Sequence, residues 1–462
     1  MYQIDFNNPV HVFFSGIGGI SMSGLARILQ SRGFKVSGSD RESSAITRGL
    51  TENGIPVMIG QKKENITKDI DLVVFTAAIH PDNPEYIAVR ELGIPHMNRS
   101  VLLGQIMRCY KDPVAVSGTH GKTTTTSMVS EILMEAGTDP TLSIGGILDS
   151  IGGNVRIGGS SYFAAEACEY TNSFLDMFPG IGIILDIDAD HLDFFKDIHD
   201  IRRSFRKFAQ LIPEDGALII NTQIPDYGEI SDGLGCDVIL YGPDSSADYW
   251  PEDISYDEFA HPTYTLCSRG SDGSVTKQTI TLSVSGEHNV YNSMAAVAAA
   301  DRLGIDRKST AAALFKYGGT ERRFERLGTR NGFTVIDDYA HHPTEIEATL
   351  RTAANYPHRE IFCVFQSHTY TRTKSLMKEF AKALTLADHI ILAKIYPARE
   401  TDDLGISSHT LAAEIEALGH PCVCLDTFDE IEKYLLKNCQ KGDLVITMGA
   451  GNINEVGRKL VS

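Results

Sequence analysis

One stretch near residue 120 constrains the fold of this chain more than any other. A short apolar run at 114–116 leads into Ser-Gly-Thr-His-Gly-Lys-Thr at 117–123, and a helical pattern continues from there to Ala136. A glycine-rich turn between a strand and a helix presents backbone N–H groups and the positive end of the helix dipole to an anion. The lysine and threonine at the end of such a turn typically reach the β/γ-phosphates and Mg²⁺. We therefore predict a nucleotide phosphate loop with glycines at Gly118 and Gly121, Lys122 at the phosphates and Thr123 at the metal.

The loop departs from the strict phosphate-binding pattern at one position. The first glycine of that pattern would fall at residue 116, where this chain has Val116. Because the strand, the glycines, the lysine and the threonine still arrive in the expected order, we interpret the stretch as a variant phosphate loop and not as an ordinary glycine-rich turn.

A second glycine turn lies near the N-terminus. An apolar strand, Val10 to Phe14, runs into glycines at 16, 18 and 19, and a helix and a second strand ending near Ser39 and Asp40 follow. This order predicts a βαβ unit with a nucleotide diphosphate bound at the glycine turn. Asp40 lies where an acidic contact to a ribose is expected, but Ser21 replaces the third glycine of the dinucleotide pattern. We therefore favour a nucleotide diphosphate other than NAD, and NAD remains an alternative.

Acidic residues and a histidine follow two apolar strands of the middle segment. The first predicted strand, 161–166, ends on Glu166, and the second, 181–187, is followed by Asp188-Ala189-Asp190-His191. Parallel strands of an open sheet end at the same edge. We therefore expect Glu166 and His191 to meet at the Mg²⁺ held by Thr123, whereas Glu169 and Asp188 fit ordinary loop positions equally well.

The alternation of strands and helices divides the chain into three segments. It restarts near Pro113, changes at 222–285 into antiparallel-type patterns rich in Asp, Ser, Gly and Tyr, and becomes α/β again after the glycines at 318–319. With roughly 150 residues per domain as a guide, a chain of 462 residues fits three domains. We predict an α/β protein with an N-terminal Rossmann-like domain (1–111), a central P-loop domain with a mostly parallel sheet (112–320) and a C-terminal Rossmann-like domain (321–462).

Two strand exits in the last segment carry more polar chemistry than a scaffold needs. They read Asp-Asp-Tyr-Ala-His-His-Pro-Thr-Glu at 337–345 and Phe-Gln-Ser-His-Thr-Tyr-Thr-Arg-Thr at 365–373. One of His341 and His342 is expected to be structural. Further upstream, Asn289 and Asn292 share one face of a predicted helix. Two amides on one face are suited to an adenine edge, although two such asparagines are commonly just polar surface.

Charge and composition argue against several classes of function. The net charge of −18 disfavours a general binder of nucleic acid or of anionic membranes. The first residues have no leader pattern, and no apolar run is long enough to span a membrane. The eight cysteines contain no Cys-x-x-Cys pair, which is typical of reduced thiols in a cytosolic protein. We therefore expect a cytoplasmic protein without nucleic-acid or membrane partners. For the oligomeric state, to which these features do not speak, we expect a monomer or weak homodimer.

Taken together, the motifs resemble those of the Mur ligase family, the ATP-dependent amino-acid ligases of peptidoglycan synthesis. The resemblance covers essentially the whole chain, because the motifs occur in the expected order. They are G-x-G-G-x-x-M-S at 16–23, S-G-T-H-G-K-T-T-T-T at 117–126, E-A-C-E-Y at 166–170, D-x-D-H at 188–191, G-x-H-N-x-x-N at 286–292, R-R-F-E at 322–325, and the two loops at 337–345 and 365–372.

The resemblance implies a role for each group of residues. The UDP moiety of a nucleotide-linked substrate would bind at Gly16, Gly18, Gly19, Ser39, Asp40, Thr76 and Arg99. ATP would bind at Gly118, Thr119, His120, Gly121, Lys122, Thr123, Thr124, Asn289, Asn292, Arg323 and Asp338. The muramyl carboxylate and the amino acid would contact Tyr339, His342, His368 and Arg372, and Mg²⁺ would be held by Thr123, Glu166 and His191. The catalytic set would be Lys122, Glu166, His191, His342 and Arg372.

The phosphate loop and the D-D-Y-A-H-H-P sequence favour the alanine-adding branch of the family. The resemblance thus implies ATP-dependent ligation of L-alanine to the lactyl carboxylate of UDP-N-acetylmuramate through an acyl phosphate, with release of ADP and phosphate. Three departures from many relatives are Leu185-Asp186, the segment E-A-C-E-Y at 166–170, and Thr369 after His368. The second departure leaves the role of Glu169 open. A family member that adds another amino acid or a recycled peptide, and outside the family an NAD-dependent oxidoreductase, remain alternatives.

Overall fold

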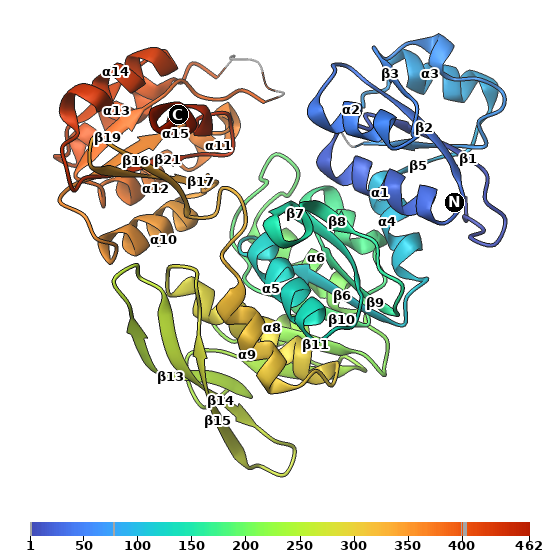
Figure 1. Cartoon of the computed structure of the whole chain (residues 1–462), viewed down its shortest axis with the longest axis horizontal. Helices are drawn as coiled ribbons and strands as arrows, with labels where there is room; N and C mark the ends of the chain where they lie inside the picture. Colours follow the sequence, from blue (N-terminus) through green and yellow to red (C-terminus); the bar gives the residue numbers. More distant parts are fainter. Residues whose placement is uncertain (1, 77–78, 399, 401–403) are drawn as a thin grey trace. The chain divides into compact units, whose positions relative to one another are not determined.

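The chain folds into two compact units whose segments alternate along the sequence. The computed structural model describes residues 2–76, 79–398, 400 and 404–462. The first unit comprises Met1–Asp186, Arg202–Ile239 and Ala296–Asp306, and the second comprises Ile187–Ile201, Leu240–Ala295 and Arg307–Ser462. Figure 1 labels their helices and strands.

The first unit begins with a five-stranded parallel sheet of order β3-β2-β1-β4-β5. Its strands are β1 (His11–Ser15), β2 (Lys35–Asp40), β3 (Val57–Ile59), β4 (Leu72–Phe75) and β5 (His96–Asn98). The helices of this region are α1 (Ile20–Ser31), α2 (Ala45–Glu52), the 3-10 turn η1 (Lys63–Asn65), α3 (Pro84–Leu92) and α4 (Arg99–Met107). This strand order is that of a doubly wound nucleotide-binding sheet, which confirms the predicted Rossmann-like fold at the N-terminus.

The same unit contains a second sheet, in which the strands run in the order β11-β10-β6-β9-β7-β8. Their bounds are β6 (Asp112–Ser117), β7 (Thr141–Leu148), β8 (Gly153–Arg156), β9 (Tyr162–Glu166), β10 (Ile181–Ile184) and β11 (Ala217–Asn221). All these neighbours are parallel except the hairpin of β7 and β8. The helical elements are α5 (Lys122–Glu135), η2 (Asp149–Ile151), η3 (Tyr170–Asp176) and α7 (Gly228–Ser231), while α6 (Ile198–Ala209), β12 (Asp237–Tyr241) and α8 (His288–Arg302) belong partly to each unit.

Strand β10 is shorter than the sequence predicted. The expected strand at 181–187 ends at Ile184. Asp186 instead accepts hydrogen bonds from the phosphate loop, with its carboxylate 2.8 Å from the His120 nitrogen and its carbonyl 3.3 Å from the Thr119 nitrogen. The predicted length was therefore wrong, because the residue after Leu185 bonds to the loop and not to a neighbouring strand.

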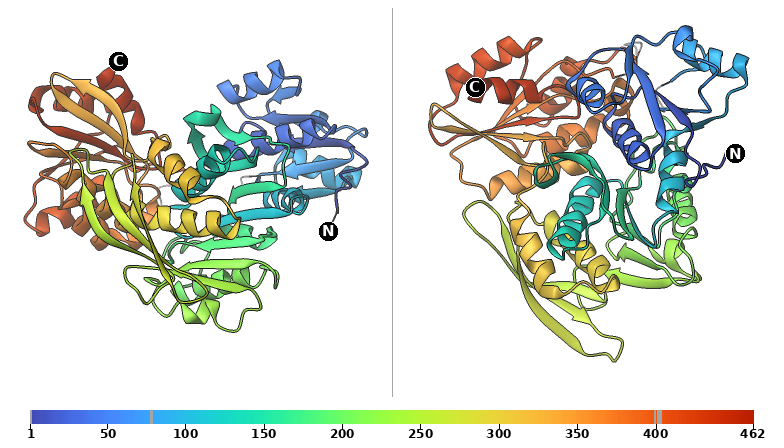
Figure 2. Two further views of the ribbon diagram at one scale, coloured as in Figure 1. Left: turned by 60° about the horizontal axis from the view of Figure 1, so that its bottom comes forward. Right: turned by 45° about the vertical axis from the view of Figure 1, so that its right-hand side comes forward.

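The second unit contains an antiparallel ribbon and a six-stranded sheet. The ribbon consists of β13 (Tyr249–Tyr256), β14 (Pro262–Arg269) and β15 (Val275–Thr281), and Figures 1 and 2 show it as long and twisted. The sheet has the order β16-β17-β21-β18-β19-β20, with β16 (Glu325–Arg330), β17 (Phe333–Asp338), β18 (Ile361–Phe365), β19 (His389–Leu392), β20 (Cys422–Cys424) and β21 (Leu444–Met448). The helices are α9 (Arg307–Lys316), α10 (Pro343–Ala354), α11 (Tyr370–Ser375), α12 (Met377–Leu384), α13 (Ser408–Ala417), α14 (Phe428–Asn438) and α15 (Asn454–Val461). The antiparallel extension and the final α/β region are both confirmed.

The central strands are buried on both faces. Every residue of β1, β18 and β21 is buried, and Val114 to Val116 in β6 are fully inaccessible. A parallel sheet covered by helices on both sides has no solvent-facing side, so its strands read as continuous apolar runs. Burying one such side chain contributes about 1.5–3 kcal/mol. Polar chemistry is therefore confined to the ends of these strands.

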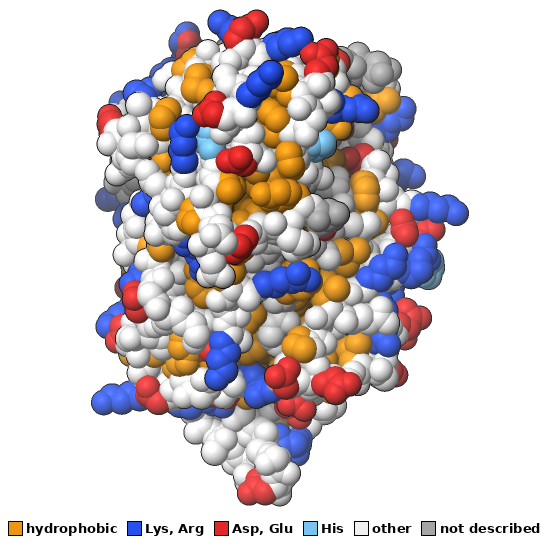
Figure 3. Space-filling model, turned by 90° about the vertical axis from the view of Figure 1, so that its right-hand side faces the viewer, with side chains coloured by type: hydrophobic (Ala, Val, Ile, Leu, Met, Phe, Trp, Pro, Cys, Tyr) orange, Lys and Arg blue, Asp and Glu red, His pale blue; other side chains and the backbone are white. Residues whose placement is uncertain are grey.

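The charged side chains of the surface, the helices and the cysteines can be compared with what the composition predicted. On the face drawn in Figure 3, side chains of both charge signs are interspersed among the coloured residues. None of the helices in the described part of the chain is long and apolar enough to cross a membrane. All eight cysteines carry free thiols.

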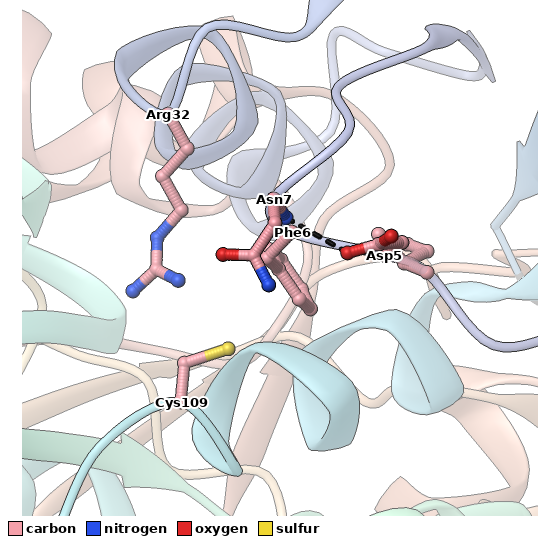
Figure 4. A pocket seen from close by; sticks show the side chains of 6 residues that line it. Asp5, Phe6, Asn7, Arg32 and Cys109 are labelled. Atoms are coloured by element: carbon pink, nitrogen blue, oxygen red, sulfur yellow. Dashed lines mark hydrogen bonds between the residues drawn. The ribbon is translucent and has the colours of Figure 1, made fainter.

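An open hollow of about 640 Å³ lies beside the N-terminal segment of the first unit. It is lined by Ile4, Asp5, Phe6, Asn7, Arg32 and Cys109, and Figure 4 shows the Arg32 and Cys109 side chains extending toward it from opposite sides. The Arg32 guanidinium lies 5.3 Å from the Phe6 ring centroid and 5.1 Å from that of Tyr110. None of the predicted ATP, UDP, metal or amino-acid residues lines this hollow. We interpret the contacts of Arg32 with the two rings as ones that hold the N-terminal segment against the first unit.

A pair of helical glycines tests this packing. Gly104 in α4 faces the backbone of η3, and an added Cβ would lie 2.8 Å from the Asp176 carbonyl carbon, whereas a Cβ on Gly49 in α2 would meet nothing within 4 Å. We expect Gly104→Ala to lower the free energy of unfolding by about 1–3 kcal/mol through overpacking. Gly49→Ala is the matched control and should raise it by about 0.5–1 kcal/mol, because alanine favours a helix. Urea unfolding of both variants measures the difference, and equal shifts would contradict the packing.

Candidate active site

The predicted phosphate loop connects the end of β6 to the start of α5 (Figure 1). Gly118 and Gly121 have φ of 144° and 77°, a region that side chains disfavour. A Cβ on Gly118 would also lie 2.9 Å from the Leu185 Cβ. The loop thus needs glycine at both positions, and the strand–loop–helix arrangement predicted from the sequence is confirmed.

Lys122 is held inside this loop by an ion pair. Its Nζ lies 3.0 Å from Glu169 Oε2 and donates to the carbonyls of Gly118 and Thr119 at 2.5 and 2.9 Å. Burial by itself would lower the pKa of Lys122, but the charge of Glu169 outweighs it and the pKa is raised. Lys122 therefore stays positively charged at the loop, and Glu169, whose role the sequence left open, is its counterion.

Glu166 ends β9 beside the phosphate loop, since Glu166 pairs in register with Val116 of β6. Its Oε1 accepts a hydrogen bond of 2.9 Å from the Gly145 N–H of β7. A Cβ on Gly145 would lie 2.6 Å from the carboxyl carbon of Glu166. Gly145 therefore fixes this carboxylate by two means: its N–H donates to it, and its lack of a side chain leaves room for it.

The donor set of this edge fits a hard divalent cation. The hydroxyl of Thr123 and the carboxylate of Glu166 offer oxygen atoms, the kind of ligand that Mg²⁺ prefers, so these two residues would fit a Mg²⁺ ion. Both residues belong to the first unit, whereas His191, the third predicted ligand, belongs to the second. A further carboxylate, Asp186, lies under the loop, and burial raises its pKa.

The N-terminal glycine turn collects the residues predicted for UDP. The N–H of Gly16 donates to the Ser39 carbonyl at 2.8 Å, and a Cβ on Gly16 would lie 2.7 Å from the Thr76 methyl group. Gly19 is the N-cap of α1. Arg99 donates to the Ser21 hydroxyl at 2.8 Å, so the serine that replaces the third glycine has a specific partner.

Asp40 and Ser39 are turned toward the protein. The Asp40 Oδ2 accepts a 2.8 Å hydrogen bond from the Gly18 N–H, so this carboxylate supports the turn itself. The Ser39 hydroxyl is fully buried and donates to Glu85 at 2.8 Å. The structure therefore gives both side chains a part in holding the turn, and their predicted contact with a ligand stays a prediction.

In the second unit, Arg372 bonds to the segment that carries His191. Its Nε and Nη2 lie 3.0 and 2.9 Å from Asp190 Oδ1, and the Asp190 side chain is buried. Burial would raise the pKa of Asp190, but Arg372 outweighs it and the pKa lies below its usual range. His191 has a positive φ of 54°. Two predicted catalytic residues, Arg372 and His191, are thus linked through Asp190.

The histidines of the two C-terminal loops differ in their tasks. His342 is the N-cap of α10 and shares a capping box with Glu345, while its Nδ1 lies 3.7 Å from Asp188. Burial lowers the pKa of His341 and of His368 to about 4, so both are neutral near pH 7. The His341 ring lies 6.0 Å from that of His368, and Arg372 donates to the His368 carbonyl at 2.8 Å. His368 and Arg372 therefore lie together as predicted, and His342 has a structural role besides its predicted one.

The two consecutive arginines at the start of the C-terminal sheet also differ. Arg322 pairs with the buried Asp337 at 2.9 Å and donates to the carbonyls of Gly449 and Gly451, so it fastens the sheet. Both guanidinium groups lie over the Tyr339 ring, at 4.9 and 5.2 Å from its centroid. Asp338 accepts from the nitrogens of Phe324 and Ala340, and burial raises its pKa to about 6.

The two predicted adenine-reading amides share one face of α8. Asn292 Nδ2 donates to Asn289 Oδ1 at 3.0 Å, and Asn289 Nδ2 donates to the Ser285 carbonyl at 2.8 Å. Both side chains are buried, so they are not the ordinary polar surface of the alternative interpretation. Their contact with adenine stays a prediction.

The sequence did not identify several residues that hold a predicted site residue or loop in place. Gly145 was not identified, because its bond to Glu166 joins residues 21 positions apart. Asp186 is an acidic residue just beyond the apolar run of β10, after Leu185, and this place near the predicted sheet edge is a signal that could have indicated it. Glu85 gave no signal, since an acidic residue in the first turn of a helix is common for dipole reasons alone.

Family models match three consecutive parts of the chain. The description "Mur ligase family, catalytic domain" matches residues 11–111, "Mur ligase middle domain" matches 116–300, and "Mur ligase, glutamate ligase domain" matches 322–451. These matches include the glycine turn, the phosphate loop and both C-terminal loops.

Relatives and solved structures agree with the family models. The chain is 59% identical to a UDP-N-acetylmuramate--L-alanine ligase of Lachnospira eligens and 54% identical to one of Agathobacter rectalis, each over 100% of both chains. It is similar to the crystal structure of the UDP-N-acetylmuramate-alanine ligase of Thermotoga maritima, with a TM-score of 0.81 at 30% identity over 98% of both chains. A murein peptide ligase of Psychrobacter arcticus has a TM-score of 0.72 at 25% identity, again over 98% of both chains. The chain therefore belongs to the Mur ligase family.

Proposed function

We propose that the chain joins L-alanine to the lactyl carboxylate of UDP-N-acetylmuramate, using ATP and passing through an acyl phosphate, with ADP and phosphate released. The observation that carries the proposal is the phosphate loop whose lysine is kept charged by Glu169, beside the carboxylate of Glu166, in a chain that belongs to this family. The relatives that are 54–59% identical over their full length are named as alanine ligases, whereas the murein peptide ligase is 25% identical. This difference favours alanine over a peptide as the added group.

The residues of the phosphate loop would bind and orient ATP. Bound with Mg²⁺, ATP supplies the phosphoryl group that activates the carboxylate. Its phosphates would be held by Gly118, Thr119, His120, Gly121, Lys122, Thr123 and Thr124. Its nucleoside would be held by Asn289, Asn292, Arg323 and Asp338. Thr123, Glu166 and His191 would hold Mg²⁺. Lys122 would offset the negative charge that otherwise repels the attacking carboxylate.

The glycine turn of the first sheet would bind UDP through Gly16, Gly18, Gly19, Ser39, Asp40, Thr76 and Arg99. Three domains would divide these tasks: 1–111 would bind the UDP substrate, 112–320 would bind ATP, and 321–462 would bind the amino acid and close the site.

The muramyl carboxylate and alanine would be oriented by Tyr339, His342, His368 and Arg372. His368 is neutral near pH 7, so Arg372 would supply the positive charge for a carboxylate. We propose a cytoplasmic enzyme that is a monomer or weak homodimer.

The amino-acid preference tests the function directly. With UDP-N-acetylmuramate, ATP and Mg²⁺ supplied, we expect phosphate release to depend on L-alanine, with glycine and L-serine slower, and to stop when Mg²⁺ is chelated. Each amino acid and the tripeptide L-Ala-γ-D-Glu-meso-diaminopimelate are offered in turn. Faster release with the tripeptide would identify a recycling ligase, and nicotinamide-dependent turnover without ATP consumption would reject a ligase altogether.

Removing Lys122 tests the phosphate loop. We expect Lys122→Ala to lower kcat by about 10²- to 10³-fold, the usual cost of losing one electrostatic contact to a developing charge. The variant also leaves Glu169 buried without its counterion, which costs about 3–5 kcal/mol of stability. The double variant Lys122→Ala/Glu169→Gln should recover part of that stability in urea unfolding without recovering kcat. A kcat near that of the unaltered protein in a folded Lys122→Ala variant would show that the loop has been misread.

Displacing Glu166 without mutating it tests the metal site. In Gly145→Ala the new Cβ would occupy the space of the Glu166 carboxylate, so we expect the Mg²⁺ concentration for half-maximal rate to rise roughly tenfold, as when a partner that orients a metal ligand is lost. Gly153→Ala is the matched control, because its Cβ, on the paired strand β8, would meet nothing within 4 Å. Magnesium titrations of phosphate release compare the two variants. Equal titration curves would count against Glu166 as a metal ligand.

A further inference from the structure

Glu85 is a carboxylate enclosed within the N-terminal sheet region. It lies in the first turn of α3, where its own N–H is capped by the Asn83 side chain at 2.9 Å, and its exposed fraction is 0%. A carboxylate that is removed from water costs folding free energy unless hydrogen bonds replace its hydration. Its partners therefore indicate what the residue is for.

Three donors from three different elements converge on this carboxylate. Oε2 accepts from the hydroxyls of Ser15, at the end of β1, and Ser39, near the end of β2, at 2.5 and 2.8 Å. Oε1 accepts from the Asn65 amide of η1 at 2.7 Å. All three partners donate, as an ionised carboxylate requires.

The two serines flank the glycine turn on either side. Ser15 and Ser39 are register partners of β1 and β2, and Gly16 follows Ser15 directly. The Ser39 carbonyl accepts the N–H groups of Gly16 and Ile17 at 2.8 and 2.9 Å. Glu85 thus holds the side chain of Ser39, and the carbonyl of Ser39 fixes Gly16 at the start of the turn.

A second path joins Glu85 to the middle of the same turn. Asn65 also donates to the Gly60 carbonyl at 2.9 Å, the Gly60 N–H donates to the Asp40 carbonyl at 2.7 Å, and the Asp40 carboxylate accepts from the Gly18 N–H. The start and the middle of the turn are therefore both connected to one buried carboxylate. In a buried polar network, losing one partner leaves the others unsatisfied.

We propose that Glu85 is a positioning residue for the UDP-linked substrate: it sets the geometry of the glycine turn and makes no contact with the substrate. This inference rests on the proposed binding of UDP at that turn. A negative charge close to a diphosphate site would by itself weaken binding, so a purely electrostatic role and a positioning role predict opposite effects of its removal. The buried carboxylate of Glu85 is tolerated because its hydrogen bonds hold the backbone N–H groups of the glycine turn, which would bind the diphosphate.

The test is Glu85→Gln, which keeps the size of the side chain and replaces one acceptor oxygen by a donor. The two hydroxyls and the amide can then no longer all donate to it, so the ends of β1 and β2 shift. We expect the Kd for UDP-N-acetylmuramate, measured by calorimetry without ATP, to rise about 10- to 100-fold, the range expected when buried hydrogen-bonding groups lose a partner. KM for UDP-N-acetylmuramate should rise with it, while kcat and KM for ATP stay within about twofold of the unaltered protein.

Glu91→Gln is the matched control. Glu91 also lies on α3 and also bonds to η1, through a 2.6 Å pair with Lys63, but both side chains are more than half exposed. Exposed pairs contribute little, so this variant should bind the substrate normally. If Glu85→Gln does not fold, Ser15→Ala removes one donor and should raise the Kd in the same direction.

The outcomes separate the inference from the proposed function. A Glu85→Gln variant that binds as well as or better than the unaltered protein, or one with lower kcat, lower stability and unchanged KM, would overturn the positioning role. Arg99→Ala tests the location of the UDP site independently and should weaken binding. If Arg99→Ala weakens binding and Glu85→Gln does not, the inference alone fails. If neither variant changes binding, the proposed UDP site fails and the inference fails with it.

Discussion

The geometry of parallel strands governs where this chain can carry out chemistry. Strands of a parallel sheet covered on both faces must be apolar along their length, and their carboxyl ends lie at one edge. The glycine turn follows β1, the phosphate loop follows β6, Glu166 ends β9 and Asp338 ends β17. Each candidate group therefore lies at the first position where the chain leaves its sheet and can present polar groups.

Buried charge pairs hold these groups ready at the strand ends. Lys122 is paired with Glu169, Arg372 with Asp190, and Arg322 with Asp337. A buried pair contributes little net stability, but losing one partner leaves a costly unpaired charge. Such pairs fix side chains in place more than they stabilise the fold. In a chain of net charge −18, two of these pairs also fix a cationic side chain, Lys122 or Arg372, at a loop that is proposed to bind an anionic substrate.

The patterns that the sequence predicted well are local ones. The two strand exits predicted at 337–345 and 365–373 are where β17 (Phe333–Asp338) and β18 (Ile361–Phe365) end, because the apolar runs of buried strands are visible residue by residue. The end of β10 was predicted wrongly, because Asp186 is drawn to the phosphate loop by backbone groups that are 66 residues distant in sequence. Boundaries that depend on a partner elsewhere in the chain carry no local signal.

By itself, the sequence determined the α/β class, the two glycine-rich turns and the identity of most candidate groups. The physical reason is that apolar runs and glycines set the local backbone, and the candidate polar residues directly follow them in the sequence. The tertiary structure alone decided which side chains support them. It made Glu169 the counterion of Lys122, turned Asp40 toward the Gly18 N–H, gave Glu166 its place beside Gly145, and enclosed Glu85 behind the glycine turn. These are contacts between distant segments, and only the folded chain brings their hydrogen-bonding groups within reach.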